Sequence, residues 1–193
     1  MDGTVFLSNI NRASILKQLK TLDPFHTLPA QDDIAAGQIF AAVFGEIAKY
    51  NVTAKCWYVY DGVRWVPDIG GAMADRLAMS LSRAMLIYVA DLQSQLYTDF
   101  VCDLQSRDAR NRMLADARAL LPCKTTDFDA DPDLFNCQNI VLNLRTHCRT
   151  QQKPELMLSK VANVEYKEDA QCDDFQKFLA EIMQDDNEKI TYL

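Results

Sequence analysis

The chain has 193 residues, 49% of them hydrophobic and 24% charged, with a formal net charge of −7. This length and composition allow one domain or two small ones around a buried core and exclude a largely disordered chain. No apolar run approaches the roughly 20 residues of a membrane-spanning helix, and the first residues lack a signal-peptide pattern, so we expect a cytoplasmic protein with no membrane contact.

Charge is distributed unevenly along the chain. From Glu165 to Leu193, nine acidic residues outnumber three lysines, so this stretch carries −6 and residues 1–164 carry only −1. A protein that binds nucleic acid tightly on its own usually has a net basic surface, because neutralising phosphates supplies most of the affinity. We therefore expect any contact with DNA to be local.

The six cysteines form no CxxC pair, and only His26 and His147 could join them as metal ligands. A closed zinc site needs four ligands in close pairs, so this spacing predicts no metal site and favours reduced, partly buried thiols. Cys137 and His147, with Asp131 or Asp133, leave a thiol-type catalytic site as an alternative. That chemistry requires an exposed thiolate beside a base.

The first strongly patterned segment is residues 32–50. Ile34 and the apolar residues after it recur at helical spacing behind Asp32, a suitable N-cap, which predicts an amphipathic helix packed inward. Gly37 and Gly45 lower the helix propensity of the segment. We expect both glycines to allow close packing against a neighbouring element.

Residues 57–66 read WYVYDGVRWV, two short runs of aromatic and β-branched residues joined by Asp61-Gly62. Asp-Gly favours a two-residue type I′ turn, because both central positions need positive φ, so the segment predicts a β-hairpin. Aromatic residues of a hairpin can also stack on the bases of single-stranded nucleic acid. Arg64 is the one basic residue inside the hairpin, so we favour a hairpin packed into the core.

Residues 72–121 predict the helical centre of the domain. Apolar residues from Leu77 to Phe100 follow one another every three or four positions, which predicts one long helix with a single apolar stripe. Ser106 indicates a break and a new N-cap, and the second helix ends before Pro122.

The acidic run at Asp127, Asp129 and Asp131 alternates like the start of an EF-hand calcium loop. The position that must be glycine is Pro132, and the twelfth position is Gln138 instead of Glu, so the calcium-loop interpretation fails. We expect a surface turn with Asx-type capping at this place.

Four short segments follow this turn, two alternating like strands and two with helical spacing: residues 139–144 and 160–166, then residues 173–183 and 187–193. The complete pattern predicts an α+β fold that is mainly helical, with a β-hairpin near 57–66 and short strands near 139–166.

Two groups of basic residues are candidates for contact with single-stranded DNA. One lies on the helix after Ser106, and the other lies in residues 145–160, where four basic residues outnumber one acidic residue. We expect weak, salt-sensitive binding. The candidates are Arg107, Arg110, Arg118, Arg145, Arg149, Lys153 and Lys160. Alternatively, these residues face a neighbouring subunit, whose acidic C-terminal segment pairs with them.

The order of these motifs resembles the domain that precedes the superfamily-three helicase motor in phage and plasmid primase-helicases, with a counterpart in poxviruses. The resemblance covers about residues 32–193, and residues 1–31 form an N-terminal extension or linker. Ile140 and Asn143 stand where the family usually has Gly and Asp. The matching residues are Trp57, Asp61, Gly62, Trp65, Asp131, Pro132, Phe135, Asn136, Asn139, Leu144, Arg145, Thr146, Lys160, Val161, Tyr166, Cys172, Phe178 and Leu179.

The resemblance implies a non-catalytic domain that supports assembly of a ring oligomer and passes DNA to a C-terminal ATP-dependent helicase. In such proteins a primase module comes first, and the resemblance to phage and plasmid proteins implies the cytoplasm of a bacterial host cell. A P-loop requires GxxxxGK[ST], and the chain contains no Gly-Lys dipeptide. We therefore expect no cofactor in this chain, and we expect ATP and Mg²⁺ in a motor domain that follows Leu193.

One further alternative is a phage protein that binds a host replication partner and has no motor. Its acidic C-terminal section could mimic nucleic acid or dock on a basic surface. A host protein recovered with the chain, from a gene without a helicase, would favour this alternative.

Overall fold

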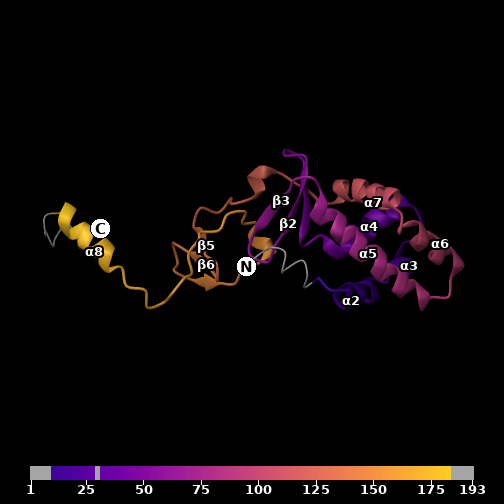
Figure 1. Cartoon of the computed structure of the whole chain (residues 1–193), viewed down its shortest axis with the longest axis horizontal. Helices are drawn as coiled ribbons and strands as arrows, with labels where there is room; N and C mark the ends of the chain where they lie inside the picture. Colours follow the sequence, from indigo (N-terminus) through magenta and orange to yellow (C-terminus); the bar gives the residue numbers. More distant parts are fainter. Residues whose placement is uncertain (1–9, 29–30, 184–193) are drawn as a thin grey trace.

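The computed structural model describes residues 10–28 and 31–183. Helices and a four-stranded sheet form the larger part of an elongated molecule, a smaller three-stranded sheet lies beside them, and the last described helix stands apart at the end (Figure 1). Both sheets and the surrounding helices confirm the predicted α+β class. In the described part of the chain, no helix combines the length and apolar character needed to cross a membrane.

The chain enters the helical layer through α2 (Arg12–Leu22) and the short α3 (Pro24–Thr27). Asn11 caps α2 by accepting a hydrogen bond from the Ser14 amide at 2.9 Å. Ile15 and Leu19, four residues apart, lie on one face of α2 and are fully buried in the main core. This part of the segment treated as an extension therefore contributes to the same core as the helices that follow.

The helix predicted behind Asp32 is confirmed as α4 (Asp33–Phe44), and the Asp32 carboxylate caps it by accepting from the Ala35 amide at 2.8 Å. The predicted segment was too long, because the chain leaves the helix after Phe44 and continues as β1 (Ala48–Asn51). Ile34 is exposed, contrary to the prediction, because it lies in the first turn on the side away from the core.

The hairpin prediction is confirmed by β2 (Cys56–Tyr60) and β3 (Trp65–Asp68), which pair antiparallel. The two-residue turn was wrong. Tyr60 pairs with Trp65, so residues 61–64 form a four-residue loop, and the Asp61 carboxylate holds it by accepting from the amides of Val63 and Arg64. The sheet has the order β3-β2-β1-β4, with the short β4 (Pro122–Cys123) parallel to β1.

The predicted long helix is two helices, α5 (Ala72–Ala90) and α6 (Gln95–Asp103). The chain turns between them, where Gln93 adopts a positive φ of 51°. The turn folds α6 back so that Tyr97 and Phe100 pack against Phe25, with ring centroids 4.7 and 6.4 Å away. The predicted break at Ser106 is confirmed, because its hydroxyl caps α7 (Arg107–Leu120) by accepting from the Ala109 amide.

The second sheet has the order β5-β6-β7, formed by β5 (Leu134–Asn136), β6 (Val141–Asn143) and β7 (Arg149–Thr150). Its strand β6 confirms the first of the two predicted strands. Residues 160–166 form no strand. They run beside β5 with isolated bonds, including one from the Ala162 amide to the Asn136 carbonyl at 2.8 Å.

Two further short elements and one helix complete the described part of the chain: η1 (Thr125–Asp127), η2 (Pro154–Leu156) and α8 (Asp173–Ile182). The predicted helix at 173–183 is confirmed by α8. The helical segment predicted at 187–193 lies outside the described residues.

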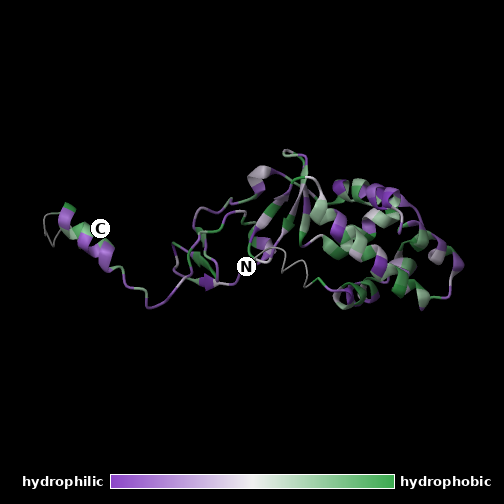
Figure 2. Ribbon diagram, in the orientation of Figure 1, coloured by the Kyte–Doolittle hydropathy of each residue, from purple (hydrophilic) through white to green (hydrophobic). Residues whose placement is uncertain are grey.

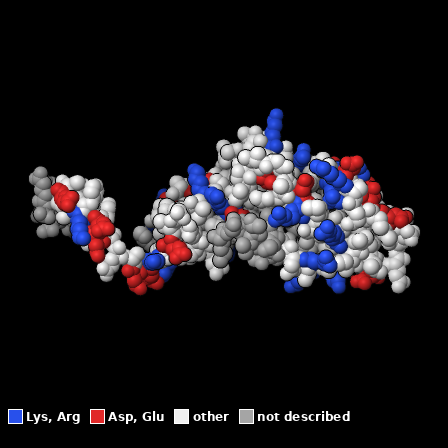
Figure 3. Space-filling view, in the orientation of Figure 1, with Lys and Arg blue, Asp and Glu red and all other residues white. Residues whose placement is uncertain are grey.

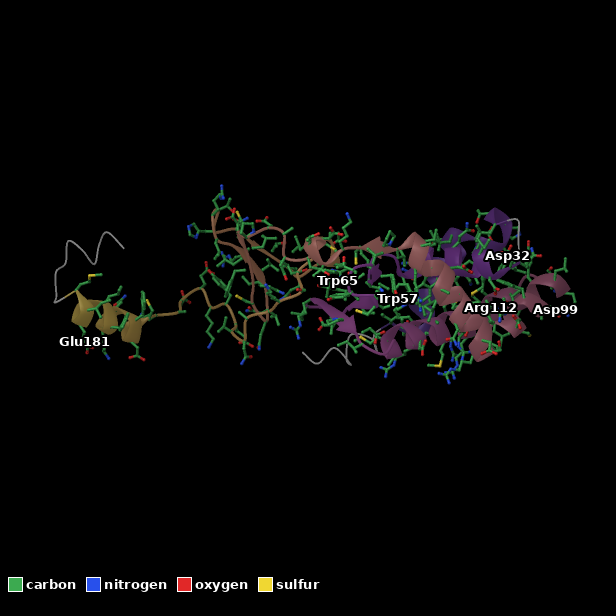
Figure 4. The ribbon with its side chains drawn as sticks, turned by 90° about the horizontal axis from the view of Figure 1, so that it is seen from above. Asp32, Trp57, Trp65, Asp99, Arg112 and Glu181 are labelled. Carbon is green, nitrogen blue, oxygen red and sulfur yellow. The ribbon has the colours of Figure 1, made fainter. Side chains whose placement is uncertain are left out.

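Two tryptophans of the hairpin anchor two separate cores (Figure 4). Trp57 packs in the main core against Phe40 and Tyr50. Trp65 packs in a second cluster with Phe128, and its indole Nε1 donates to the Pro154 carbonyl at 2.9 Å. Both rings are buried, so the hairpin is packed, as predicted, and its tryptophans are not available for base stacking.

Candidate interaction surfaces

Two arginines of α7 are held by neighbouring parts of the fold. The Arg112 guanidinium lies 2.8 Å from the Asp33 carboxylate and 3.2 Å from that of Asp103, so it joins α7 to α4 and α6. Arg110 donates to the carbonyls of Leu104 and Gln105 at the end of α6. Carbonyls at a helix C-terminus lack partners within their own helix, so Arg110 has a capping role there.

Arg107 and Arg118 lie on one outer face of α7. They are eleven residues apart, which is close to three full turns and about 16.5 Å along the helix. Arg118 lies over the Tyr50 ring, with its guanidinium carbon 5.1 Å from the ring centroid. Within residues 10–28 and 31–183, neither arginine forms an ion pair, so this face has uncompensated positive charge.

The basic residues of the second sheet are largely paired with carboxylates of the same chain. Arg145 lies 2.8 Å from Asp133, and Lys160 lies 4.0 Å from Asp129. Lys153 forms no ion pair among the described residues. The predicted basic region at 145–160 is therefore mostly neutralised.

Arg149 is held by two side chains of the acidic C-terminal section. Its guanidinium lies 2.9 Å from the Glu168 carboxylate and 5.7 Å from the centroid of the Tyr166 ring. The hydrogen bond from Arg149 and its charge lower the pKa of Glu168 below its ordinary value. This ion pair joins the basic and acidic sections of one chain, and the alternative in which a neighbouring subunit supplies the acidic segment stays a prediction.

A further basic face, which was not predicted from the sequence, lies on α5 and α2. Arg76 and Arg83 are exposed on α5, seven residues apart, and neither forms an ion pair in the described part of the chain. The adjacent α2 carries three basic residues and no acidic one. Figure 3 shows lysine and arginine side chains gathered over these two helices. The seven-residue spacing of Arg76 and Arg83 places both on the side of α5 away from its buried stripe. This spacing could have predicted the basic face from the sequence.

The helix α8 presents an apolar face that nothing covers in the described structure. Phe175, Phe178 and Ile182 are 56%, 52% and 52% exposed, and α8 has no buried residue. Figure 2 shows the mixture of hydrophobic and hydrophilic residues along this helix, and Figure 4 places Glu181 on it, at the far end of the molecule from Arg112.

The acidic run forms a turn, as predicted, and each of its three carboxylates accepts hydrogen bonds from other groups of the chain. Asp127 accepts from the Lys124 amide at 2.7 Å, and Asp131 accepts from the Asp133 amide at 2.9 Å. Asp129 accepts from the amide and the hydroxyl of Ser159. An open pocket of about 280 Å³ lies beside this turn, and in the described residues no three potential metal ligands cluster.

The alternative thiol site is not assembled. Cys137 is buried, burial raises the pKa of its thiol, and His147 is exposed. No hydrogen bond joins the two side chains in the part of the structure described. A raised pKa lowers the thiolate fraction at neutral pH, which is the opposite of what a nucleophilic cysteine requires.

A family model described as "D5 N terminal like" matches residues 37–184. The match begins inside α4 and ends just after α8, so it includes both sheets and the helices between them. No curated protein matches the chain.

Proposed function

The chain belongs to the D5 N terminal like family, the domain that precedes the superfamily-three helicase in primase-helicases, and on this basis we propose that it is a non-catalytic assembly and DNA-passing domain. Its copies associate into a ring in a phage- or plasmid-type primase-helicase and pass single-stranded DNA to an ATP-dependent motor. The observation that carries the proposal is the family match, which extends over about three quarters of the chain.

The sequence motifs favour ATP hydrolysis by the motor and not by this chain. ATP and Mg²⁺ serve the motor, because the chain contains no Gly-Lys dipeptide and therefore no P-loop to cradle phosphates. The acidic turn supports the same division, since its carboxylates are engaged by backbone amides.

The contact with single-stranded DNA is assigned to the outer face of α7, with Arg107 and Arg118 as its cations. Among the candidates, Arg107, Arg118 and Lys153 are exposed and form no ion pair within the described residues, and the two arginines share one face of a helix. Arg145, Arg149 and Lys160 each lie beside a carboxylate. Phosphate attraction depends on uncompensated charge, so the α7 face supports the stronger local contact. With two cations, the contact is weak and sensitive to salt.

Two measurements on the purified chain test the proposal. Sedimentation velocity over a concentration series should show self-association, and fluorescence polarisation with a labelled oligothymidine should show binding that weakens linearly in log–log form as salt rises. A chain that stays monomeric at every concentration and leaves the oligonucleotide unbound at low salt would contradict the proposal.

A further inference from the structure

The isolation of α8 indicates that this helix is completed by a partner. It has ten residues and no buried side chain, and helices shorter than about 12–15 residues are marginal in water on their own. Phe175, Phe178 and Ile182 lie at i, i+3 and i+7, the spacing of a single apolar stripe. A stripe of this kind gains stability when it packs against another apolar surface.

The outer face of α5 offers such a surface. Met79, Leu86 and Ile87 are 38%, 40% and 41% exposed and lie on the side of α5 opposite its buried stripe. Arg76 and Arg83 lie three residues before Met79 and Leu86, so they border the same face. The face therefore combines apolar contact area with two cations, and one exposed carboxylate, Asp75, lies beside them in the first turn of α5.

One pair of charges beside each face is complementary to a pair beside the other, and the two pairs have equal spacing. On α8, Asp174 and Glu181 stand next to the apolar stripe and are seven residues apart, about 10.5 Å along the helix axis. Arg76 and Arg83 have the same spacing on α5. Within the described residues, Asp174 contacts only the exposed Lys177, at 3.8 Å, so its charge is available to a partner.

We propose that α8 of one copy docks on the outer face of α5 of a second copy, with its acidic pair beside Arg76 and Arg83. In Figure 1, α8 stands at one end of the elongated molecule and α5 lies in the helical part, on the other side of the second sheet, so the contact joins copies. A contact between two different faces is heterologous, and repeating it closes a ring or extends a filament. This inference rests on the proposed function, because it specifies the surface through which the copies assemble.

Charge-reversal variants test the contact, whether the two helices run parallel or antiparallel to each other. One variant is Arg76→Glu with Arg83→Glu, and the other is Asp174→Arg with Glu181→Arg. Each alone places like charges at the contact, and we expect the dissociation constant for self-association to rise by at least about tenfold. An equimolar mixture restores both contacts, so association should return to nearly the wild-type level.

The matched control is Lys55→Glu with Lys153→Glu, two exposed lysines outside α2, α5 and α8, which changes net charge by the same amount as the α5 variant. It should associate like the wild type. Circular dichroism verifies that each variant is folded. A second test, Phe175→Ser with Phe178→Ser, should also weaken association without changing net charge.

The outcomes separate this inference from the function on which it rests. A wild-type chain that never associates overturns both. A wild-type chain that associates, with variants that associate equally well or with a mixture that fails to recover, overturns the α8–α5 contact alone. Loss of oligonucleotide binding in the α5 variant, with unchanged sedimentation, would reassign this face to nucleic acid and also overturn the contact.

Discussion

Gly37 of α4 lies so close to α7 that a Cβ at position 37 would be 2.8 Å from the Cβ of Asp116 and 3.0 Å from the Ala117 amide nitrogen. Both neighbours belong to a helix whose position is fixed by its own buried residues. We therefore expect Gly37→Ala to lower the free energy of unfolding by about 1–3 kcal/mol through overpacking. Helix propensity alone predicts a gain of about 1 kcal/mol, so the sign of the change separates the two effects.

Urea denaturation measures this difference. The control is Gln38→Ala, one residue further along the same helix, where the side chain is exposed and the change should stay within about 0.5 kcal/mol. A Gly37→Ala protein that is more stable than the wild type would show that α4 and α7 can move apart.

The parts of the fold that local signals specify could be predicted from the sequence. The cap at Asp32 and the hairpin depend on residues within a few positions of one another, and both are present in the structure. The apolar stripe predicted a helix that is too long at α5. The end of α5 depends on Phe25, a residue distant in sequence, because Tyr97 and Phe100 of α6 pack against its ring. Periodicity contains no information about such a partner.

The ion pairs of the arginines could not be predicted from the sequence for the same reason. Sequence spacing identifies carboxylates three or four residues from an arginine on one helix. Arg112 instead pairs with Asp33, 79 residues away, and Arg149 pairs with Glu168 beyond the second sheet. Which arginines remain uncompensated therefore follows only from the folded chain.

The two tryptophans of the hairpin provide a matched pair of substitutions. Trp65 donates from its indole nitrogen to the Pro154 carbonyl, whereas within the described residues the indole nitrogen of Trp57 has no acceptor. Replacement by Phe removes similar volume at both buried positions. Trp65→Phe should cost about 0.5–1.5 kcal/mol more than Trp57→Phe, because it alone removes a hydrogen bond. Equal unfolding midpoints in urea would argue against a structural role for this bond.

Thiol reactivity should follow burial. Burial raises the pKa of the Cys123 thiol to about 11, which lowers its thiolate fraction at neutral pH about a hundredfold relative to an ordinary thiol. With iodoacetamide and peptide mapping, we expect the exposed Cys102, Cys148 and Cys172 to be alkylated first. Cys123 and Cys137 should react only in denaturant. Rapid, selective alkylation of Cys137 in the folded chain would instead revive the thiol-site alternative.

Asp23 should make stability depend on pH in the acidic range. Its carboxylate accepts from His26 at 2.5 Å and from the Tyr88 hydroxyl at 2.7 Å, and these bonds lower its pKa below 3.8. A carboxyl group with a lowered pKa in the folded state stabilises the fold above its ordinary pKa. The stabilisation disappears as the pH falls through the lowered value.

The test compares the wild type with Asp23→Asn, since Asn tolerates the positive φ of 45° at this position. The wild type should be the more stable protein at neutral pH, and the difference in urea midpoint should vanish well below pH 3.8. Asp91→Asn, which removes an exposed carboxylate, serves as the control. A difference that stays constant with pH would mean that the Asp23 charge is not involved.

DNA binding should depend on which arginines are removed, and not on net charge alone. Arg107→Ala with Arg118→Ala and Arg145→Ala with Arg149→Ala each remove two positive charges, so long-range electrostatics change equally. The first pair is uncompensated within the described residues, whereas the second pair is bound to Asp133 and Glu168. Losing two phosphate contacts should weaken oligothymidine binding about tenfold and reduce the log–log salt slope by about 1.4. The second variant should bind within about threefold of the wild type, because its arginines already pair with carboxylates. If both variants lose the same affinity, only the net charge of the domain attracts DNA, and the α7 face has no specific part in binding.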